Sequence, residues 1–249
     1  MSKEQPLITV VTVVYNDVQH IEDTILSVVN QTYPNIEYII IDGGSTDGTV
    51  DIIKKYEERI AYWVSEPDKG IYDAMNKGIQ KATGEWIGVM NSGDTFHSKT
   101  VLQQIFSFDE YMLYDVVYGD AIEVSSGMET VIKGEDSSYK PGVPPVYRHG
   151  ASFVRGHIHK IYNFDLSKEE LYGYALDYYC IYTLYRAGLQ FKHVNVVVLD
   201  YDKEGISNHP WRNKYFRALI ENEGSRNIQF YIRLLHSIFR SLMNRIRNY

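Results

Sequence analysis

The first hundred residues alternate between short apolar runs and amphipathic segments, and this order constrains the fold more than any other feature of the sequence. Residues 7–15 form a β-branched apolar run typical of a buried strand, and residues 17–31 place apolar side chains at helical spacing. The alternation continues through residues 36–41, 46–60, 62–65, 70–82 and 86–90. This succession predicts an α/β domain with a Rossmann-like, mostly parallel central sheet flanked by helices.

The second half of the chain is less regular. The patterns there predict strands over residues 114–120 and 121–133, a helix over 171–187 closed by Gly188, and a strand over 191–199. A turn signal at residues 125–127 interrupts the second of these strands.

Charge divides the chain into two parts. The 249 residues carry a net charge of -7, but residues 208–249 contain eight Arg or Lys and two Glu, which leaves -13 on residues 1–207. We therefore expect a domain over residues 1–207 and a basic helical tail over residues 208–249. The acidic body argues against nucleic-acid binding, because a phosphate backbone attracts basic surfaces.

The tail contains an amphipathic pattern over residues 228–249, with apolar side chains on one helical face and arginines on the other. Such a helix can lie in the plane of a membrane, or its apolar stripe can pack on the domain or on a second subunit as in a homodimer. Both interpretations remain open at this stage.

The sequence favours a cytoplasmic protein, either free or peripheral on the inner face of the membrane. Its N-terminus lacks the charged start and apolar stretch of a secretory signal, and its single cysteine, Cys180, cannot form an internal disulfide. It also lacks an apolar run of about 18 residues, the length that a spanning helix needs.

Polar residues follow three of the expected strands, namely Asn16, Asp42 and Asp94. Ligands of open parallel sheets bind beyond the carboxyl ends of the strands, so we expect the functional site at this edge. The Asp42 carboxylate can hold a base or a ribose, although the Gly-Gly-Ser segment after it can equally be a simple turn with a helix cap. The phosphate-loop and Gly-x-Gly-x-x-Gly patterns are both missing.

Asp94 lies in a Ser-Gly-Asp turn after an apolar strand. A carboxylate in that place can hold Mg²⁺ or Mn²⁺ against a diphosphate and so stabilise a departing phosphate group. The alternative is that Asp94 caps a helix beginning near Ser98.

Four segments, residues 10–16, 39–49, 66–79 and 84–94, together resemble the N-terminal half of family 2 glycosyltransferases, which have a GT-A fold. The resemblance continues weakly through residues 149–153, 174–179 and 205–207, and the 66–79 segment is similar to the branch that builds bacterial surface polysaccharides. It implies an inverting hexosyltransferase-type enzyme that uses Mg²⁺ or Mn²⁺. The donor would be a nucleotide sugar, such as a UDP-sugar, and the acceptor a hydroxyl of a lipid-linked glycan in capsule, exopolysaccharide or O-antigen assembly.

The resemblance also implies roles for individual residues. Asp94 would be the metal ligand, and Gly93 stands where the family has a second acidic residue. The family often has Asp-Asp-Gly-Ser where this chain has Asp42 followed by Gly43, so only Asp42 carries over. The implied donor contacts are Thr12, Val14, Tyr15, Asp42, Lys69, Asp73, Asn76, Asn91, Ser92 and Gly93.

Inverting transfer requires a base that takes the proton of the acceptor hydroxyl. Asp177 aligns with the acidic residue that does this in the family, with Glu169 and Glu170 as rivals and a solvated helix position as the simpler alternative. His149 is expected to contact the acceptor or a phosphate.

Two other functions remain open from the sequence. The chain can be a non-catalytic sugar-nucleotide-binding subunit of a polysaccharide assembly complex, since Gly93 departs from the family pattern. A nucleotidyltransferase is the third alternative, but the Gly-rich basic loop that such enzymes use on triphosphates is missing.

Overall fold

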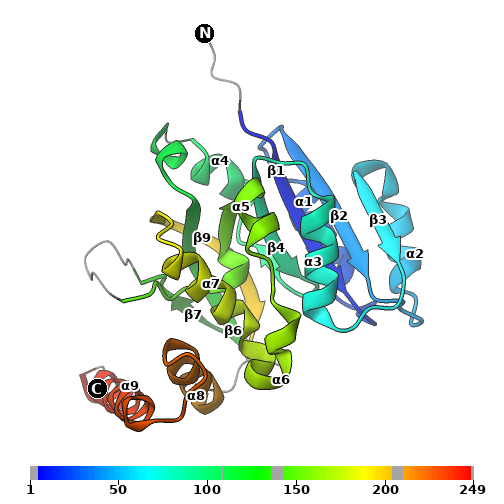
Figure 1. Ribbon diagram of the computed structural model, residues 1–249. Helices are drawn as coiled ribbons and strands as arrows, with labels where there is room; N and C mark the ends of the chain where they lie inside the picture. The colour runs from blue at the N-terminus through cyan, green and yellow to red at the C-terminus, as the bar shows by residue number, and fades with distance from the viewer. Residues whose placement is uncertain (1–4, 108, 136–142, 204–209, 248–249) are drawn as a thin grey trace.

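A twisted β-sheet runs through the centre of the computed structural model, which describes residues 5–107, 109–135, 143–203 and 210–247 (Figure 1). Its strands are β1 Ile8–Val14, β2 Ile36–Asp42, β3 Tyr62–Ser65, β4 Trp86–Asn91, β5 Thr95–Phe96, β6 Val116–Ser125, β7 Met128–Ile132, β8 Ser152–Arg155 and β9 Phe191–Asp202.

The α-helices are α1 Ile21–Val29, α2 Thr49–Lys55, α3 Ile71–Lys81, α4 Val101–Ile105, α5 Gly156–Ile161, α6 Glu169–Tyr172, α7 Leu176–Arg186, α8 Pro210–Glu221 and α9 Ile228–Arg247. Short 3-10 turns are η1 Glu57–Arg59, η2 Asp109–Leu113, η3 His149–Ala151, η4 Leu166–Lys168 and η5 Gly173–Ala175.

The first four strands form the parallel half of the sheet in the order β3-β2-β1-β4. Their bounds agree with the apolar runs of the sequence to within one or two residues, since each strand is buried by helices and reads as an apolar run. The expectation of a parallel α/β sheet is confirmed for this half.

The other half of the sheet is mixed. β8 pairs antiparallel with both β4 and β6, whereas β6 and β9 run parallel. The expected strand break at residues 120 and 121 is wrong: β6 continues through it and turns back into β7 only at Ser126 and Gly127, both of which have positive φ. The turn signal was therefore the real boundary.

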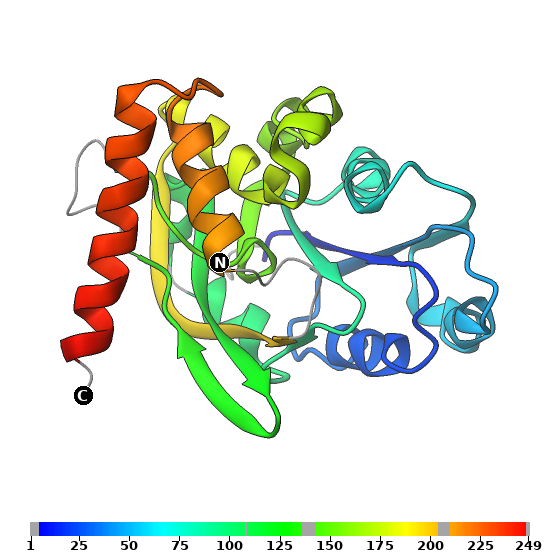
Figure 2. The same cartoon turned by 90° about the horizontal axis from the view of Figure 1, so that it is seen from below.

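Helices cover both faces of the sheet (Figure 2). The α3, α5, α7 and α8 helices pack on one face in one cluster of buried residues, and α1, α2 and α4 pack on the other face in a second cluster. Alternate β1 residues enter the two clusters, with Val11 and Val13 in the first and Val10 and Val14 in the second. The sheet thus lies buried between two layers, as an α/β fold requires.

The α1 helix begins at Ile21 with His20 as its N-cap residue, and no side chain among the described residues donates or accepts a capping hydrogen bond there. One helix expectation is wrong. The helix expected over residues 171–187 is divided into α6, η5 and α7, because Gly173 has a φ of 55°, which a continuing helix cannot contain.

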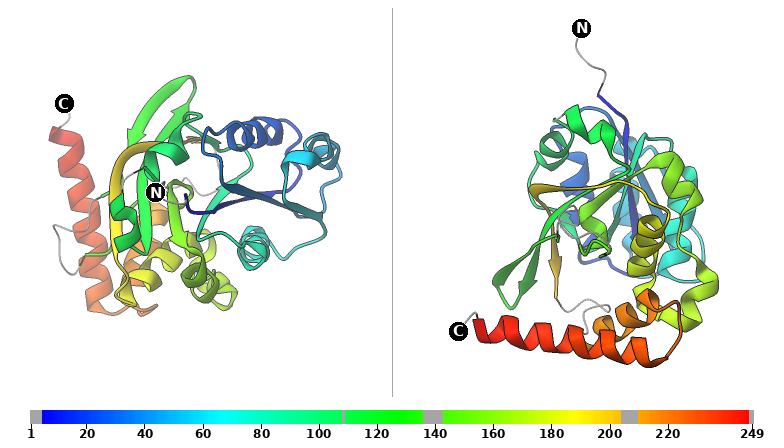
Figure 3. Two further views of the ribbon diagram at one scale, coloured as in Figure 1. Left: turned by 90° about the horizontal axis from the view of Figure 1, so that it is seen from above. Right: turned by 60° about the vertical axis from the view of Figure 1, so that its left-hand side comes forward.

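The C-terminal helices α8 and α9 form a hairpin at the far end of the molecule from α2 (Figure 3). Ala218, Leu219 and Ile220 of α8 and Phe230 of α9 are buried in the same cluster as α7. Part of the basic tail therefore belongs to the core. None of the helices in the described part of the chain is both long and apolar enough to cross a membrane.

Candidate active site

The ends of three strands meet at one edge of the sheet. Val14 of β1 pairs with Asp42 of β2, and Val13 pairs with Asn91 of β4. The loops that follow continue this pairing, because Gly43 N donates to Val14 O at 2.9 Å and Ser92 N donates to Val13 O at 2.9 Å. The edge predicted from strand ends is thus one continuous surface of adjoining loops.

Asp42 is fully buried, and its carboxylate is occupied by groups of the chain itself. Its Oδ2 accepts hydrogen bonds from Gly44 N at 3.1 Å, Ser45 N at 2.9 Å and the Ser65 hydroxyl at 2.5 Å. Its Oδ1 accepts from the Ser45 hydroxyl at 2.5 Å. A carboxylate offers about four lone-pair sites, so at most the remaining site on Oδ1 is left for a ligand.

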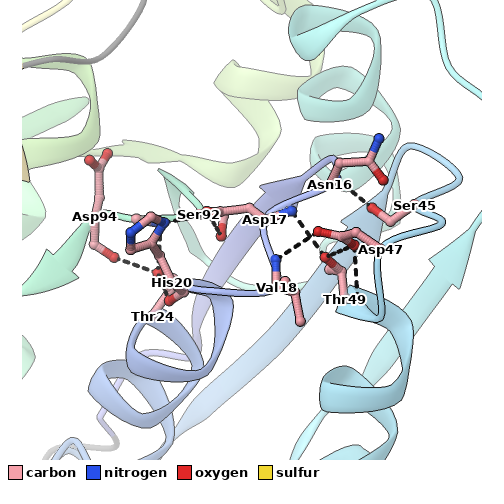
Figure 4. Close-up of polar contacts among 11 residues, drawn as sticks. Asn16, Asp17, Val18, His20, Thr24, Ser45, Asp47, Thr49, Ser92 and Asp94 are labelled. Atoms are coloured by element: carbon pink, nitrogen blue, oxygen red, sulfur yellow. Dashed lines mark hydrogen bonds and ion pairs between the residues drawn. The ribbon is translucent and has the colours of Figure 1, made fainter.

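Asn16 joins the loop after β1 to the loop after β2. Its backbone adopts a φ of 49°, a left-handed conformation in which Asn is one of the better tolerated residues. Its N–H donates to Ser45 Oγ at 2.7 Å, and its Oδ1 accepts from Thr46 N at 2.8 Å (Figure 4). The two loops therefore form one unit.

Asp17 ties this unit to the end of β4 (Figure 4). Its Oδ2 accepts from the Ser92 hydroxyl at 2.7 Å, and its Oδ1 lies 2.6 Å from His20 Nδ1. Thr24 adds a second tie, because its hydroxyl donates to Asp94 O at 2.8 Å and accepts from Gly93 N at 3.0 Å. No motif around Asp17 indicates this role.

Asp94 does not cap a helix, since the next one, α4, begins at Val101 with Thr100 as its N-cap residue. Burial raises the pKa of the Asp94 carboxyl to about 7, although the charge of Arg148 and a hydrogen bond from the Asn91 side chain act in the opposite direction. Burial disfavours the charged form of this carboxylate, and a bound cation would stabilise that form.

The residues around Asp94 fit a divalent ion of the Mg²⁺ type. Asn91 Oδ1 is buried beside it and has no hydrogen-bond partner among the described residues. Those residues contain no group of three or more His, Cys, Asp or Glu side chains that would form an all-protein metal site. Mg²⁺ commonly binds through one or two protein carboxylates together with substrate phosphates, and Asp94 offers such a carboxylate.

The residues expected near the donor base differ in accessibility. Thr12 is buried, and its hydroxyl shares a 3.0 Å hydrogen bond with Tyr38, so its side chain does not reach the surface. Val14 is buried as well, whereas Tyr15 is 65% exposed. Only the Tyr15 ring offers a ligand a side-chain surface.

The residues expected on α3 mainly hold the structure together. The Asn76 side chain exchanges two hydrogen bonds with the backbone of Phe164, at 2.8 Å and 2.9 Å, so both of its polar groups are engaged. Asp73 accepts from Lys69 N at 3.0 Å and lies 3.7 Å from Lys77 Nζ. Lys69 itself is exposed in the loop before α3.

Asp68 supplies a carboxylate near Gly43, the position at which the family often has an aspartate. A Cβ at Gly43 would lie 2.6 Å from Asp68 Oδ2 and 3.3 Å from the Tyr15 ring. The other oxygen, Asp68 Oδ1, accepts from Gly70 N at 2.8 Å. Asp68 therefore fills the space of a side chain at position 43, which no motif in the sequence indicated.

Asp177 lies in the first turn of α7. Burial raises the pKa of its carboxyl, while a hydrogen bond from Tyr178 N and the charge of Arg148 act to lower it. Its rivals are exposed, and Glu169 Oε1 lies 3.7 Å from the position of a Cβ at Gly70. The charge of Arg148 thus acts on both Asp177 and Asp94.

His149 lies among aromatic rings, with centroids 5.1 Å from Phe164 and 6.2 Å from His159. Burial lowers the pKa of its imidazole to about 3, so the ring is neutral. It lacks the charge that a phosphate contact would use.

The charge of Arg148 thus acts on both Asp94 and Asp177, and Asp42 lies about 10 Å from the end of β4, two strand spacings away across the sheet. A separate hollow of about 380 Å³ lies at the opposite end of β4 and is lined in part by Glu85 and Lys160. It does not include any residue of the expected site.

Comparison with known proteins identifies the family of the chain. The sequence profile described as Glycosyl transferase family 2 matches residues 9–188. An uncharacterized glycosyltransferase of Mycobacterium tuberculosis is 31% identical over 211 residues, which cover 82% of this chain and 78% of that protein. TuaG of Bacillus subtilis, a candidate teichuronic acid biosynthesis glycosyltransferase, is 37% identical over 125 residues, covering 45% of this chain and 50% of TuaG.

Solved structures share the fold at low sequence identity. Residues 1–349 of S. aureus TarS in complex with UDP align with a TM-score of 0.66 and 21% identity, covering 90% of this chain and 68% of that one. A Pyrobaculum calidifontis mannosyltransferase in complex with GDP-Man and Mn²⁺ aligns with a TM-score of 0.66 and 16% identity, covering 94% of this chain and 69% of that one. Because the profile spans most of the chain, from the first strand through α7, the chain belongs to glycosyl transferase family 2.

Proposed function

We propose that this chain is an inverting glycosyltransferase that moves a sugar from a UDP-sugar to a hydroxyl group of a lipid-linked glycan in polysaccharide biosynthesis. The observation that supports the proposal is that burial raises the pKa of both Asp94 and Asp177, while the charge of the same residue, Arg148, acts to lower both. One carboxylate serves the donor side and the other the acceptor side. The UDP complex of TarS and the teichuronic acid role given to TuaG support the choice of donor and pathway class.

On the donor side, the exposed ring of Tyr15 and the carboxylate of Asp68 lie together in front of Gly43. A flat ring and a hydrogen-bond acceptor suit a nucleotide base, and the exposed Lys69 in the neighbouring loop suits the diphosphate. Asp94 would hold Mg²⁺ or Mn²⁺, which neutralises the charge that develops on the departing diphosphate. The Mn²⁺ complex of the Pyrobaculum enzyme supports this choice of ions.

On the acceptor side, Asp177 accepts the proton of the attacking hydroxyl. The hydroxyl oxygen forms a bond to the anomeric carbon as the bond to the diphosphate breaks, so the configuration inverts and the nucleoside diphosphate leaves. A raised pKa makes Asp177 a stronger base than an ordinary carboxylate. His149, as a neutral ring, remains a candidate for an acceptor contact.

The test is to screen a panel of sugar nucleotides for hydrolysis with Mn²⁺. Release of a nucleoside diphosphate that requires the metal is the expected result. In a parallel assay with a nucleoside triphosphate and a sugar 1-phosphate, release of pyrophosphate would instead identify a nucleotidyltransferase. Donor binding with no turnover, even when glycolipid extracts are supplied as acceptor, would identify a non-catalytic subunit.

We also propose that α9 contacts the membrane surface. Phe230 packs on Tyr215 of α8 and is 1% exposed, but a second stripe on the same helix is more than half exposed. This exposed stripe consists of Ile228, Tyr231, Ile232, Leu235 and Phe239. Residues 228–249 contain four Arg and no Asp or Glu, so anionic lipid is the surface that complements this helix.

Liposome sedimentation with anionic vesicles tests the membrane contact. Leu235→Ser combined with Phe239→Ser removes apolar area from the exposed stripe without changing the charge. Gln229→Ser combined with His236→Ser is the control on the polar side of the helix. Equal sedimentation of all three proteins would refute the contact, and loss of a homodimer in the stripe variant would assign the stripe to a second copy instead.

A further inference from the structure

Arg148 is the residue around which the two halves of the site come together. It directly precedes η3, a turn that contacts β4, β6, β9 and α7. Its carbonyl oxygen accepts from Ala151 N at 2.9 Å, which fixes the backbone at the start of the turn. Arg148 thus enters the site from a segment that is anchored on four elements.

The side chain of Arg148 is held by an aromatic ring. Its guanidinium carbon lies 3.8 Å from the centroid of the Tyr201 ring. Tyr201 is buried, and its hydroxyl donates to Glu123 Oε2 at 3.1 Å, so the ring itself is fixed. Stacking uses the flat face of a guanidinium and leaves its N–H groups in the plane, where they match the oxygens of a phosphate.

The charges around Arg148 come from both sides of the site. Burial raises the pKa of both Asp94 and Asp177, and the positive charge of Arg148 acts against burial at each of them. Asp94 Oδ2 lies 3.8 Å from the position of a Cβ at Gly150, two residues after Arg148. The charge of one guanidinium group therefore acts on the carboxylate proposed for the donor side and on that proposed for the acceptor side.

Other cations at this edge are placed differently. Lys77 lies 2.9 Å from Glu66 and 3.7 Å from Asp73, so it is engaged in ion pairs within its own helix and loop. Lys69 lies in the exposed loop before α3, where its neighbour Asp68 faces Gly43. Of these three cations, Arg148 is the one whose charge acts to lower the pKa of Asp94.

We propose that Arg148 binds the diphosphate of the nucleotide donor and stabilises the negative charge of the leaving group between Asp94 and Asp177. This inference rests on the proposed function, because it assumes that Asp94 faces the donor diphosphate. Arg148 then takes the phosphate contact that the sequence assigned to its neutral neighbour His149. The reaction gains a fixed positive group at the place where the diphosphate charge develops.

Calorimetry with Mn²⁺ tests the inference, with UDP and uridine as the two probes. Removing a charged hydrogen bond to a phosphate costs about 1.5–3 kcal/mol, so Arg148→Gln should weaken UDP binding by roughly 10–150-fold. Uridine carries no phosphate, and its affinity should not change. The UDP affinity of Arg148→Lys should lie between those of the wild type and of Arg148→Gln, since lysine keeps the charge but lacks the planar guanidinium group.

Arg155→Gln is the matched control. Arg155 is also stacked on an aromatic ring, 4.4 Å from Trp86, but it lies at the opposite end of β4. We expect this variant to lower thermal stability without changing UDP affinity. A loss confined to Arg148→Gln would therefore reflect the phosphate and not a general weakening of the fold.

Two results would overturn the inference in different ways. UDP affinity within twofold of wild type in Arg148→Gln would overturn it alone, and would instead assign Arg148 to a phosphate of the acceptor or to a structural ion pair. A wild-type chain that binds neither UDP nor GDP in the presence of Mn²⁺ would overturn the proposed function and this inference with it.

Discussion

Asp42 can hold the turn after β2 or contact the nucleotide donor, and Asp42→Asn distinguishes these two roles. The substitution keeps the shape of the side chain and removes its charge. If the amide oxygen takes the place of Oδ2, it can still accept from Gly44 N, Ser45 N and the Ser65 hydroxyl, and the Ser45 hydroxyl can rotate to accept from the new amide. The variant should therefore fold, with weaker bonds in the turn.

The size of the effect follows from those contacts. Hydrogen bonds to a charged group contribute about 1 kcal/mol more than neutral ones. Three such bonds to a fully buried carboxylate predict a loss of about 3 kcal/mol in the free energy of unfolding. For a chain of this size that loss lowers the melting temperature by roughly 6–12 °C.

Urea unfolding and UDP calorimetry on the same variant provide the assay. Ser65→Ala removes one of the donors to Asp42 from a more exposed residue and should cost about 1.5 kcal/mol, which calibrates the scale. An Asp42→Asn variant that unfolds within about 0.5 kcal/mol of wild type, the range of an ordinary surface substitution, would refute the assignment of Asp42 to the turn. Loss of UDP binding without loss of stability would make it a donor contact instead.

Three further predictions concern the site and the core. Asp94→Ala should abolish donor hydrolysis and the Mn²⁺-dependent part of UDP binding in calorimetry, and binding that still responds to Mn²⁺ would exclude Asp94 as the ligand. Asp177→Asn should keep UDP affinity and lose transfer; because burial raises the pKa of Asp177, wild-type kcat should fall on acidification already above the ordinary aspartate value of about 3.9. Gly78→Ala places a Cβ against Val11 Cγ1 and should cost about 1–3 kcal/mol in urea unfolding, whereas a loss that is simply additive with that of Val11→Ala would argue against this contact.

The parallel half of the fold could be predicted because its information is local. Each strand from β1 to β4 is a short apolar run bounded by turn residues, and each helix between them carries its own apolar stripe. Asp42 and Asp94 could be identified for the same reason, since Asp42 directly follows one such run and Asp94 lies in the short turn after another. Periodicity thus locates both the elements and the residues at their ends.

Contacts between distant segments could not be predicted in this way. Thr12 and Asn76 lie where the family pattern implies donor contacts, but Tyr38 and the Phe164 backbone engage their side chains. Arg148 shows the opposite case, since its neighbours are residues brought together only by folding. The sequence predicts where a residue lies on its helix or strand, but it does not predict which residue from a distant segment its side chain contacts.

The two glycines that depart from the family pattern show why a missing residue is a poor sign of lost function. Gly93 has a φ of 91°, and a Cβ there would lie 3.9 Å from Asp17 Oδ2. At Gly43 the corresponding Cβ would collide with Asp68 Oδ2 at 2.6 Å. Asp17 and Asp68, which come from other loops, therefore place a carboxylate next to the two positions at which the family has an acidic residue. An acid at 43 would displace Asp68, and one at 93 would be strained by the left-handed backbone. Each glycine therefore accommodates the aspartate beside it. Introducing the family's acidic residue at position 43 or 93 should weaken UDP binding.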